Sequence, residues 1–333
     1  MPNSIKLSVI IALYNNKEHI QKTIMSVVNS NLKLEDYEII VINDGSTDGG
    51  EVVVEALSKH YKNIILLNKK NGGQSSARNI GFKNAKGQYI LCLDSDDFIV
   101  SEFLSSELNF IIDNDLDLCA YSFVKWKEDK STVAHAYPKS VKPINGADFI
   151  NNYIVLGAMC MYFYKAEIIN NNNLTLIEGV YLEDEEFVLK FMLFCERIMC
   201  TQTPFYNYVF HSSSSTNNSS FHHRVRLIHD LVKVTISVDS LKLKLSSPKL
   251  IDGVNRKKEQ LTMAILLNIF KFSLPSSEVN YIIKLLKDNN LYPLKIKLNS
   301  LKYKISSLFL NNEPLLRILL YLNRKWIMYS SKE

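Results

Sequence analysis

The sequence predicts an α/β fold in which a mainly parallel sheet is flanked by helices, followed by a helical, basic C-terminal region. Two observations favour this fold. Strand-like apolar runs alternate with helical periodicity over residues 7–123, and the pattern turns helical and basic from about Phe221 onward. Of the 333 residues, 47% are apolar and 22% charged, which excludes collagen-like and wholly disordered classes. The length suggests about two domains.

The individual elements follow from the local pattern. Short continuous apolar runs predict strands that are buried on both faces, and apolar residues at helical spacing predict the helices between them. The predicted strands are Leu7–Leu13, Tyr37–Ile42, Asn63–Leu67, Gln88–Leu93 and Asp117–Phe123. The predicted helices are Lys17–Asn29, Val52–His60, Gln74–Ala85 and Ser101–Asn114.

The pattern after residue 123 is less regular. Residues 125–150 have weak periodicity and are predicted to be a variable excursion, whereas Ile154–Tyr164 is apolar and strand-like. Glu183–Cys195 is predicted to be a helix with an acidic first turn, where carboxylates suit the helix dipole. Lys257–Phe272 and Asn280–Asp288 are predicted to be amphipathic helices.

Three polar clusters follow predicted strands. They are Tyr14-Asn15, Asp44-Gly45-Ser46 and Asp94-Ser95-Asp96-Asp97. Because ligands bind at the carboxyl ends of parallel strands, these clusters predict a site at one sheet edge. Carboxylates this close repel one another unless a cation lies among them, and their hard oxygens suit Mg²⁺ or Mn²⁺. The alternative is that the acids cap helices. Motifs of the GxGxxG and GxxxxGK[ST] types are absent, which disfavours a dehydrogenase and a P-loop kinase.

Two further features allow both a functional and a structural interpretation. The run Glu183-Asp184-Glu185-Glu186 is either a solvated helix start or the location of a general base near a metal. His211 precedes a Ser-rich loop and is either a metal or phosphate contact or a structural residue. No Ser/His/Asp order or HExxH motif indicates a hydrolase.

Taken together, these segments resemble the family 2 glycosyltransferases, which have the GT-A fold. The resemblance covers about residues 5–220, and it implies a bacterial enzyme of capsule, O-antigen or exopolysaccharide synthesis. The matching strings, in order, are Val9-Ile10-Ile11-Ala12-Leu13-Tyr14-Asn15, Asn43-Asp44-Gly45-Ser46-Thr47-Asp48, Asn71-Gly72-Gly73-Gln74-Ser75-Ser76-Ala77-Arg78-Asn79-Ile80-Gly81, Leu93-Asp94-Ser95-Asp96-Asp97 and Glu183-Asp184-Glu185-Glu186-Phe187.

The resemblance also implies residue roles. It implies that Asp184 is the catalytic base, and that Asp96, with His211, binds an Mn²⁺ or Mg²⁺ ion that bridges the donor diphosphate. The chain departs from the family where Ala12 replaces a usual Pro and Val209 a frequent basic residue. The residues that the resemblance assigns to the nucleotide-sugar donor are Ala12, Tyr14, Asp44, Arg78, Asp94 and Ser95.

The function implied is inverting transfer of a sugar from a nucleotide-diphosphate sugar, a UDP-sugar by expectation, to a hydroxyl of a glycan or polyprenyl-diphosphate-linked oligosaccharide. The implied domains are a catalytic domain over 1–220, with donor binding in 1–123 and the acceptor side in 124–220, and a helical region over 221–333. One alternative is a non-catalytic nucleotide-sugar-binding or membrane scaffold that kept the fold. Another is a nucleotidyltransferase, which Tyr14-Asn15-Asn16 disfavours because a Gly-rich basic loop is expected there.

The charge is unevenly distributed. Residues 221–333 carry 20 Lys and Arg against 8 Asp and Glu, a net charge of +12, whereas the whole chain has +5. This composition suits a helix at an anionic membrane surface, and the alternative is a bundle that packs on the catalytic domain or a second subunit. Nucleic acid is not expected as a partner. No run of 18 apolar residues and no secretory signal is recognised, and five cysteines without a CxxC pair are expected to be reduced. We therefore expect a cytoplasmic protein, peripheral on the inner face of the plasma membrane.

Overall fold

The computed structural model describes residues 5–127, 130–135, 137–210, 220–295 and 301–330. The chain divides into two compact units. One unit holds the sheet and consists of Met1–Phe149, Leu156–Gly179 and Glu183–Ser214. The other is mainly helical and consists of Ile150–Val155, Val180–Leu182 and Ser215–Glu333.

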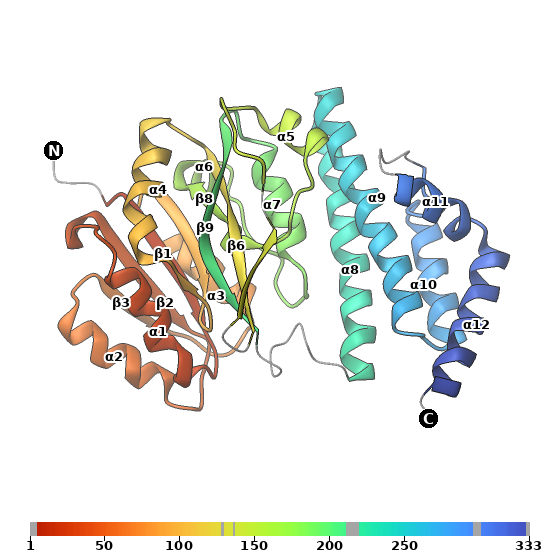
Figure 1. Cartoon of the computed structure of the whole chain (residues 1–333), viewed down its shortest axis with the longest axis horizontal. Helices are drawn as coiled ribbons and strands as arrows, with labels where there is room; N and C mark the ends of the chain where they lie inside the picture. The colour runs from red at the N-terminus through yellow and green to blue at the C-terminus, as the bar shows by residue number, and fades with distance from the viewer. Residues whose placement is uncertain (1–4, 128–129, 136, 211–219, 296–300, 331–333) are drawn as a thin grey trace. The chain divides into compact units, whose positions relative to one another are not determined.

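The first unit is built on a nine-stranded sheet (Figure 1). The strand order is β3-β2-β1-β4-β8-β6-β9-β5, and β7 pairs with β6. The strands β3, β2, β1 and β4 are parallel to one another, β8 is antiparallel to both β4 and β6, and β9 is parallel to β6. The bounds are β1 Leu7–Leu13, β2 Tyr37–Asn43, β3 Ile64–Asn68, β4 Tyr89–Asp94, β5 Phe98–Ile99, β6 Leu118–Lys127, β7 Lys130–His135, β8 Tyr162–Lys165 and β9 Ile198–Val209.

Helices cover both faces of this sheet. On one face, the helices α1 (Lys17–Val28), α2 (Gly50–His60) and α4 (Ser101–Asp113) share a buried apolar core with alternate residues of β1. On the other face, α3 (Gln74–Asn84) packs so closely that a Cβ atom on Gly81 would lie 2.4 Å from Ile10 Cγ2. The remaining helices of the sheet region are α5 (Gly146–Asn152), α6 (Ala166–Asn171) and α7 (Asp184–Met192).

The sequence predictions for the first half of the chain are confirmed. The fold is α/β, and the first four strands begin and end within one residue of the predicted bounds. The prediction of one strand over Ile154–Tyr164 is wrong, because the chain there is irregular up to a 3₁₀ turn at Met159–Met161 and pairs only as β8. The excursion at 125–150 contains the end of β6, then β7 and α5, and β9 was not predicted.

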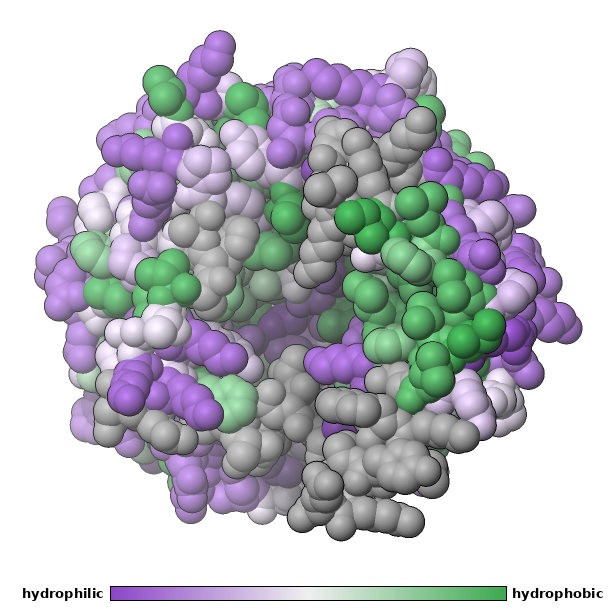
Figure 2. Space-filling view, turned by 45° about the vertical axis from the view of Figure 1, so that its right-hand side comes forward, coloured by the Kyte–Doolittle hydropathy of each residue, from purple (hydrophilic) through white to green (hydrophobic). Residues whose placement is uncertain are grey.

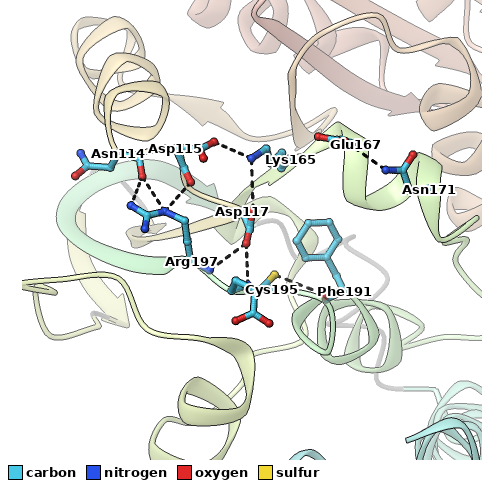
Figure 3. A network of polar contacts seen from close by, with 10 residues as sticks. Asn114, Asp115, Asp117, Lys165, Glu167, Asn171, Phe191, Cys195 and Arg197 are labelled. Atoms are coloured by element: carbon cyan, nitrogen blue, oxygen red, sulfur yellow. Dashed lines mark hydrogen bonds and ion pairs between the residues drawn. The ribbon is translucent and has the colours of Figure 1, made fainter.

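A polar network at the start of β6 fixes the turn between α7 and β9 (Figure 3). The Asp117 carboxylate accepts the backbone N–H of Arg197 at 3.0 Å, and Lys165 Nζ lies 2.7 Å from Asp115 and 3.6 Å from Asp117. The Arg197 guanidinium donates to the carbonyl oxygens of Asn114 and Asp115. Hydrogen bonding to Lys165 lowers the pKa of Asp115. The network therefore holds the C-terminal end of α7 at the sheet edge opposite the carboxyl ends of β4 and β6.

The second unit confirms the helical prediction for the region after Phe221. Its longest helices, α8 and α9, pack against each other, and α11 and α12 are also in contact. Within this unit, the backbone N–H of Tyr181 donates to the buried Asp230 of α8 at 3.3 Å, and Arg226 lies over the Tyr181 ring. Among the helices described, none combines the length and apolarity needed to cross a bilayer. The bounds are α8 Phe221–Leu241, α9 Pro248–Lys271, α10 Ser276–Asp288, α11 Leu301–Leu310 and α12 Glu313–Ser330.

Candidate active site

The ends of β1, β2 and β4 bring the predicted polar clusters to one edge of the sheet. In the parallel registers, Leu13 pairs with Asn43 and Ala12 pairs with Asp94. The predicted shared edge is therefore confirmed. Tyr14 follows β1 directly and is 53% exposed, so its ring is open to a ligand at this edge.

The loops after β1 and β2 lock together through side chains. Asn15, which has a positive φ of 48°, accepts the backbone N–H of Thr47 at 2.8 Å and donates its own N–H to Ser46 Oγ at 3.1 Å. The backbone N–H of Lys17 donates to Asp48 at 2.8 Å. Asn tolerates a left-handed conformation better than most residues, which suits it to this position. These contacts fix the backbone immediately after Tyr14.

Asp44 turns into the protein and holds the loop before α3. Its carboxylate accepts the backbone N–H groups of Gly72 at 2.9 Å and Gly73 at 2.7 Å, and it forms an ion pair with Lys69. Asp44 is buried. Gly73 has a φ of +89°, a conformation that a residue with a side chain rarely adopts. The structure thus gives Asp44 partners within the chain, and its predicted contact with a nucleotide stays a prediction.

The Asp94-Ser95-Asp96-Asp97 segment is fixed by hydrogen bonds from two helices. The carboxylate of Asp94, 28% exposed, accepts Gln74 Nε2 of α3 at 3.0 Å. Ser95 is buried, and its hydroxyl accepts Asn16 Nδ2 at 2.8 Å. The Thr23 hydroxyl of α1 shares its single proton between the carbonyl oxygens of Ser95 and Asp97, which lie at 2.9 and 2.8 Å. These hydrogen bonds define the backbone conformation of the segment.

Asp97 joins this segment to β9. Its carboxylate accepts one hydrogen bond from the Tyr206 hydroxyl and another from the backbone N–H of Val209, at 2.7 Å. Burial, reinforced by the nearby Asp94 carboxylate, raises the pKa of Asp97 to about 8. The sequence did not indicate Tyr206, because nothing local marks a tyrosine in a strand as the partner of a residue 109 positions earlier. Asp97 thus links β9 to the acidic segment.

A buried arginine connects the end of β4 to the start of α7. The Arg78 guanidinium lies 2.6 Å from Asp94 and 3.6 Å from Glu183, and its side chain is 6% exposed. The sequence had not singled out Glu183 as a partner of Arg78. The pair brings Asp184, the first residue of α7, toward the same edge as Asp94.

Asp184 combines partial exposure with an acidic neighbourhood. Its carboxylate accepts the backbone N–H of Glu185 at 3.0 Å. Burial of the carboxyl, followed by the charges of Glu183 and Glu185, raises the pKa of Asp184 well above its usual value, and the Arg78 cation opposes that shift. Perturbed carboxyl groups are typical of catalytic sites, although structural ion pairs also perturb them.

Aromatic packing fixes α7 to the sheet unit. Phe187 is fully buried and stacks on Phe82 of α3, with ring centroids 5.3 Å apart. Phe191 meets Tyr164 edge to face at 5.0 Å. Because Phe187 lies three residues after Asp184, the buried ring anchors the helical turn that carries the partly exposed acid.

The acidic segment fits a divalent cation that takes most of its ligands from elsewhere. Asp96 is half-buried at the sheet edge, two residues from Asp94. Within the ranges that the structure describes, no group of three His, Cys, Asp or Glu side chains could hold a metal by itself. A magnesium-like ion needs only one or two protein carboxylates when phosphates and water complete its coordination. His211, the other predicted metal ligand, lies outside the described residues.

The fold and the polar strand edge define a GT-A-like α/β protein with a C-terminal helical region. Of solved structures, the chain resembles residues 1–349 of Staphylococcus aureus TarS in complex with UDP-GlcNAc, with a TM-score of 0.68 and 20% identity over 87% of this chain and 82% of that one. It also resembles the mannosyltransferase PcManGT of Pyrobaculum calidifontis in complex with GDP-Man and Mn²⁺, with a TM-score of 0.56 and 14% identity over 98% and 88% of the two chains. At these identities the likeness shows the fold.

Residues 8–168 match the family model of Glycosyl transferase family 2, so this part of the chain is similar to that family. A related sequence is the poly(ribitol-phosphate) beta-N-acetylglucosaminyltransferase TarP of Staphylococcus aureus, which is 32% identical over 192 residues, 56% of this chain and 58% of the relative. The chain spans from 32% to 64% of the length of the first curated relatives that it matches.

Proposed function

We propose that the chain is a metal-dependent glycosyltransferase that moves a sugar, with inversion, from a nucleoside diphosphate sugar to a hydroxyl group. The observation that carries the proposal is the Asp94–Arg78–Glu183 bridge, which brings the partly exposed Asp184 to the edge that carries Tyr14 and Asp96. The match of residues 8–168 to the model of Glycosyl transferase family 2 supports the same reaction class.

The proposed chemistry needs a base and a stabilised leaving group. The acceptor hydroxyl oxygen attacks the anomeric carbon from the face opposite the diphosphate. As the new C–O bond forms, the bond to the diphosphate breaks and its electron pair leaves with the nucleotide, which inverts the anomeric centre. Asp184 accepts the hydroxyl proton, a contribution on the order of 10²–10⁴-fold. When bound, Mn²⁺ or Mg²⁺ supplies Lewis-acid stabilisation of the diphosphate charge, and Asp96 is the residue that would hold it.

The donor and acceptor are part of the proposal. We infer a UDP-sugar donor, because UDP-GlcNAc is the ligand named for a structural relative and the TarP relative transfers N-acetylglucosamine. In this proposal, the ring of Tyr14, which is 53% exposed, stacks on the base, and Ala12, the register partner of Asp94 at the end of β1, lines the same site. In this proposal, Asp44, Arg78 and Ser95 shape the donor site. The acceptor is a hydroxyl of a glycan, of a polyol-phosphate polymer or of a lipid-linked oligosaccharide.

In this proposal, residues 1–220 carry out catalysis and residues 221–333 support them. The sugar transfer takes place on the cytoplasmic side of a membrane. The competing function is that of a scaffold that binds nucleotide sugars without transferring them. Such a scaffold would share the fold and donor binding but would release no nucleotide.

The test measures donor binding and turnover separately. UDP-, GDP- and dTDP-sugars are added with and without Mn²⁺ or Mg²⁺, and the thermal midpoint and the release of nucleoside diphosphate are recorded. We expect metal-dependent stabilisation by a UDP-sugar and slow UDP release. Asp184→Asn should lower release at least 100-fold, an order set by general-base catalysis, with the donor-induced shift kept. The neighbouring Glu185→Gln is the matched control. Turnover by Asp184→Asn equal to wild type would refute the base assignment, and donor binding without release would favour the scaffold.

A further inference from the structure

Helix α12 has apolar side chains on two faces. Leu316 and Leu320 are buried within the helical unit, as expected for residues four apart on one face. Ile318, Tyr321 and Leu322 are spaced at i, i+3 and i+4 and are 56%, 56% and 55% exposed. An amphipathic helix that packs only against its own bundle would have polar residues at these positions.

Helix α11 repeats this arrangement. Leu310 is buried, whereas Ile305, Leu308 and Phe309 follow the same i, i+3, i+4 spacing and are 48%, 73% and 47% exposed. Figure 2, which turns the side of the molecule with α10–α12 forward, shows hydrophobic side chains gathered in a patch on the right of the view. We define the α11–α12 face as Ile305, Leu308, Phe309, Ile318, Tyr321 and Leu322.

The sequence around this face is strongly basic. Residues 289–330 contain seven Lys and Arg against the single acid Glu313. Lys302 and Lys304 belong to α11, and Arg324 and Lys325 to α12. Large exposed apolar clusters on a protein indicate an interaction surface, and the surrounding charge indicates the sign of its partner. The partner is therefore apolar and anionic.

We propose that the α11–α12 face docks on an anionic lipid bilayer, with both helices lying in the interface. Apolar side chains beside Lys and Arg are the composition of such helices, and Tyr321 and Trp326 are of the residue types that concentrate at membrane interfaces. A second copy of the chain is a poorer occupant. In a twofold contact the same basic segment would face itself, and the like charges would oppose association. The face thus matches an anionic lipid surface in both apolarity and charge.

This inference deepens the proposed function, because a bilayer surface would bring the enzyme to a lipid-linked acceptor. Lipid binding itself needs neither donor nor turnover. The two proposals can therefore fail independently.

The test is co-flotation of the full chain with vesicles of phosphatidylcholine alone or with 30% phosphatidylglycerol added. In the variant Leu308→Gln/Ile318→Gln/Leu322→Gln, glutamine keeps helix propensity but removes apolar area. The matched control is Leu34→Gln/Val52→Gln/Val133→Gln, which alters side chains of the sheet unit that are 56%, 59% and 61% exposed. UDP release is measured in parallel for each protein.

We expect wild type and control to float with the anionic vesicles, less so at high salt because salt screens the basic residues. The triple variant should bind on the order of 10- to 100-fold more weakly, because three exposed side chains would no longer bury apolar area in the lipid. Failure of wild type to float, or equal flotation of wild type and the α11–α12 variant, would overturn the proposal. A concentration-dependent dimer that the variant abolishes, without vesicle binding, would assign the face to a second copy instead. Flotation without UDP release would leave the lipid surface intact and count against the transferase.

Discussion

Replacing Arg78 with methionine removes the cation that joins β4 to α7. The guanidinium is almost fully buried and lies 2.6 Å from Asp94 and 3.6 Å from Glu183. Breaking a buried ion pair by removing one partner costs roughly 3–5 kcal/mol. Because Asp94 is 28% exposed and water would solvate part of the freed charge, we expect a cost about 1 kcal/mol smaller, about 2–4 kcal/mol. For a domain of about 200 residues this corresponds to a fall in melting temperature of about 4–16 °C.

Thermal unfolding of Arg78→Met, Arg78→Lys and wild type tests this reasoning. Lysine keeps the charge but not the fork-shaped set of donors, so its midpoint should lie between the other two. Lys6→Met is the matched control, since Lys6 pairs with Asp36 at 3.1 Å but is 42% exposed, and an exposed pair contributes at most about 1 kcal/mol. Since Arg78 also opposes the raised pKa of Asp184, the methionine variant should need a higher pH for turnover. Equal midpoints for Arg78→Met and Lys6→Met would refute the ionic bridge.

Three further perturbations test other parts of the sheet unit. Gly146→Ala should lower the free energy of unfolding, measured by urea titration, by about 2 kcal/mol or more. Overpacking typically costs 1–3 kcal/mol, and the new Cβ would lie 1.8 Å from the backbone oxygen of Met192. Gly50→Ala, whose new Cβ would lie no closer than 3.2 Å to Asp48 Oδ1, is the control and should not have this effect. Asp97→Asn should flatten the pH dependence of the free energy of unfolding. Folded Asp97 keeps its proton to about pH 8 but the unfolded chain releases it near pH 4, so wild type loses stability as the pH rises between these values. Equal pH dependence of the free energy of unfolding in wild type and variant would contradict this. Asp96→Ala should abolish the Mn²⁺-dependent part of the UDP-induced thermal shift, and an unchanged shift would place the metal elsewhere.

The parallel half of the sheet could be predicted because each strand is a continuous apolar run bounded by polar turns. Leu7–Leu13 and Tyr37–Asn43 are buried almost throughout, so their local pattern and final environment agree. The register then follows, and with it the meeting of Ala12 with Asp94 at the sheet edge. The site clusters were found because they directly follow these strands.

The other half of the sheet depends on contacts that sequence does not encode locally. Strand β9 contains Pro204 and polar residues, and its pairing with β6 shifts register between Ala120 and Phe123, so neither propensity nor alternation marks it. The run Ile154–Tyr164 is apolar throughout, yet only its end pairs as β8. A short apolar run does not distinguish a strand from a buried irregular segment. Glu183, which contacts Arg78, and Tyr206, which contacts Asp97, each lie about 100 residues from their partner in the chain, so these contacts could not be inferred from spacing.

The structure separates the motif residues into two kinds. One kind keeps part of its surface open and comprises Tyr14, Asp96 and Asp184. The other kind is buried and bonded to its own chain and comprises Asp44, Arg78, Ser95 and Asp97. Substitutions of the open kind should change turnover or donor binding with little effect on the melting temperature. Substitutions of the buried kind should lower the melting temperature as well as turnover or donor binding. An unpaired buried polar group costs stability and also frees a loop of the site. Tyr14→Ala and Asp44→Asn provide the sharpest comparison, since they flank the same pair of interlocked loops. If Asp44→Asn weakened UDP binding and left the melting temperature unchanged, Asp44 would be a direct ligand of the nucleotide rather than a residue that positions the loop at Gly72 and Gly73.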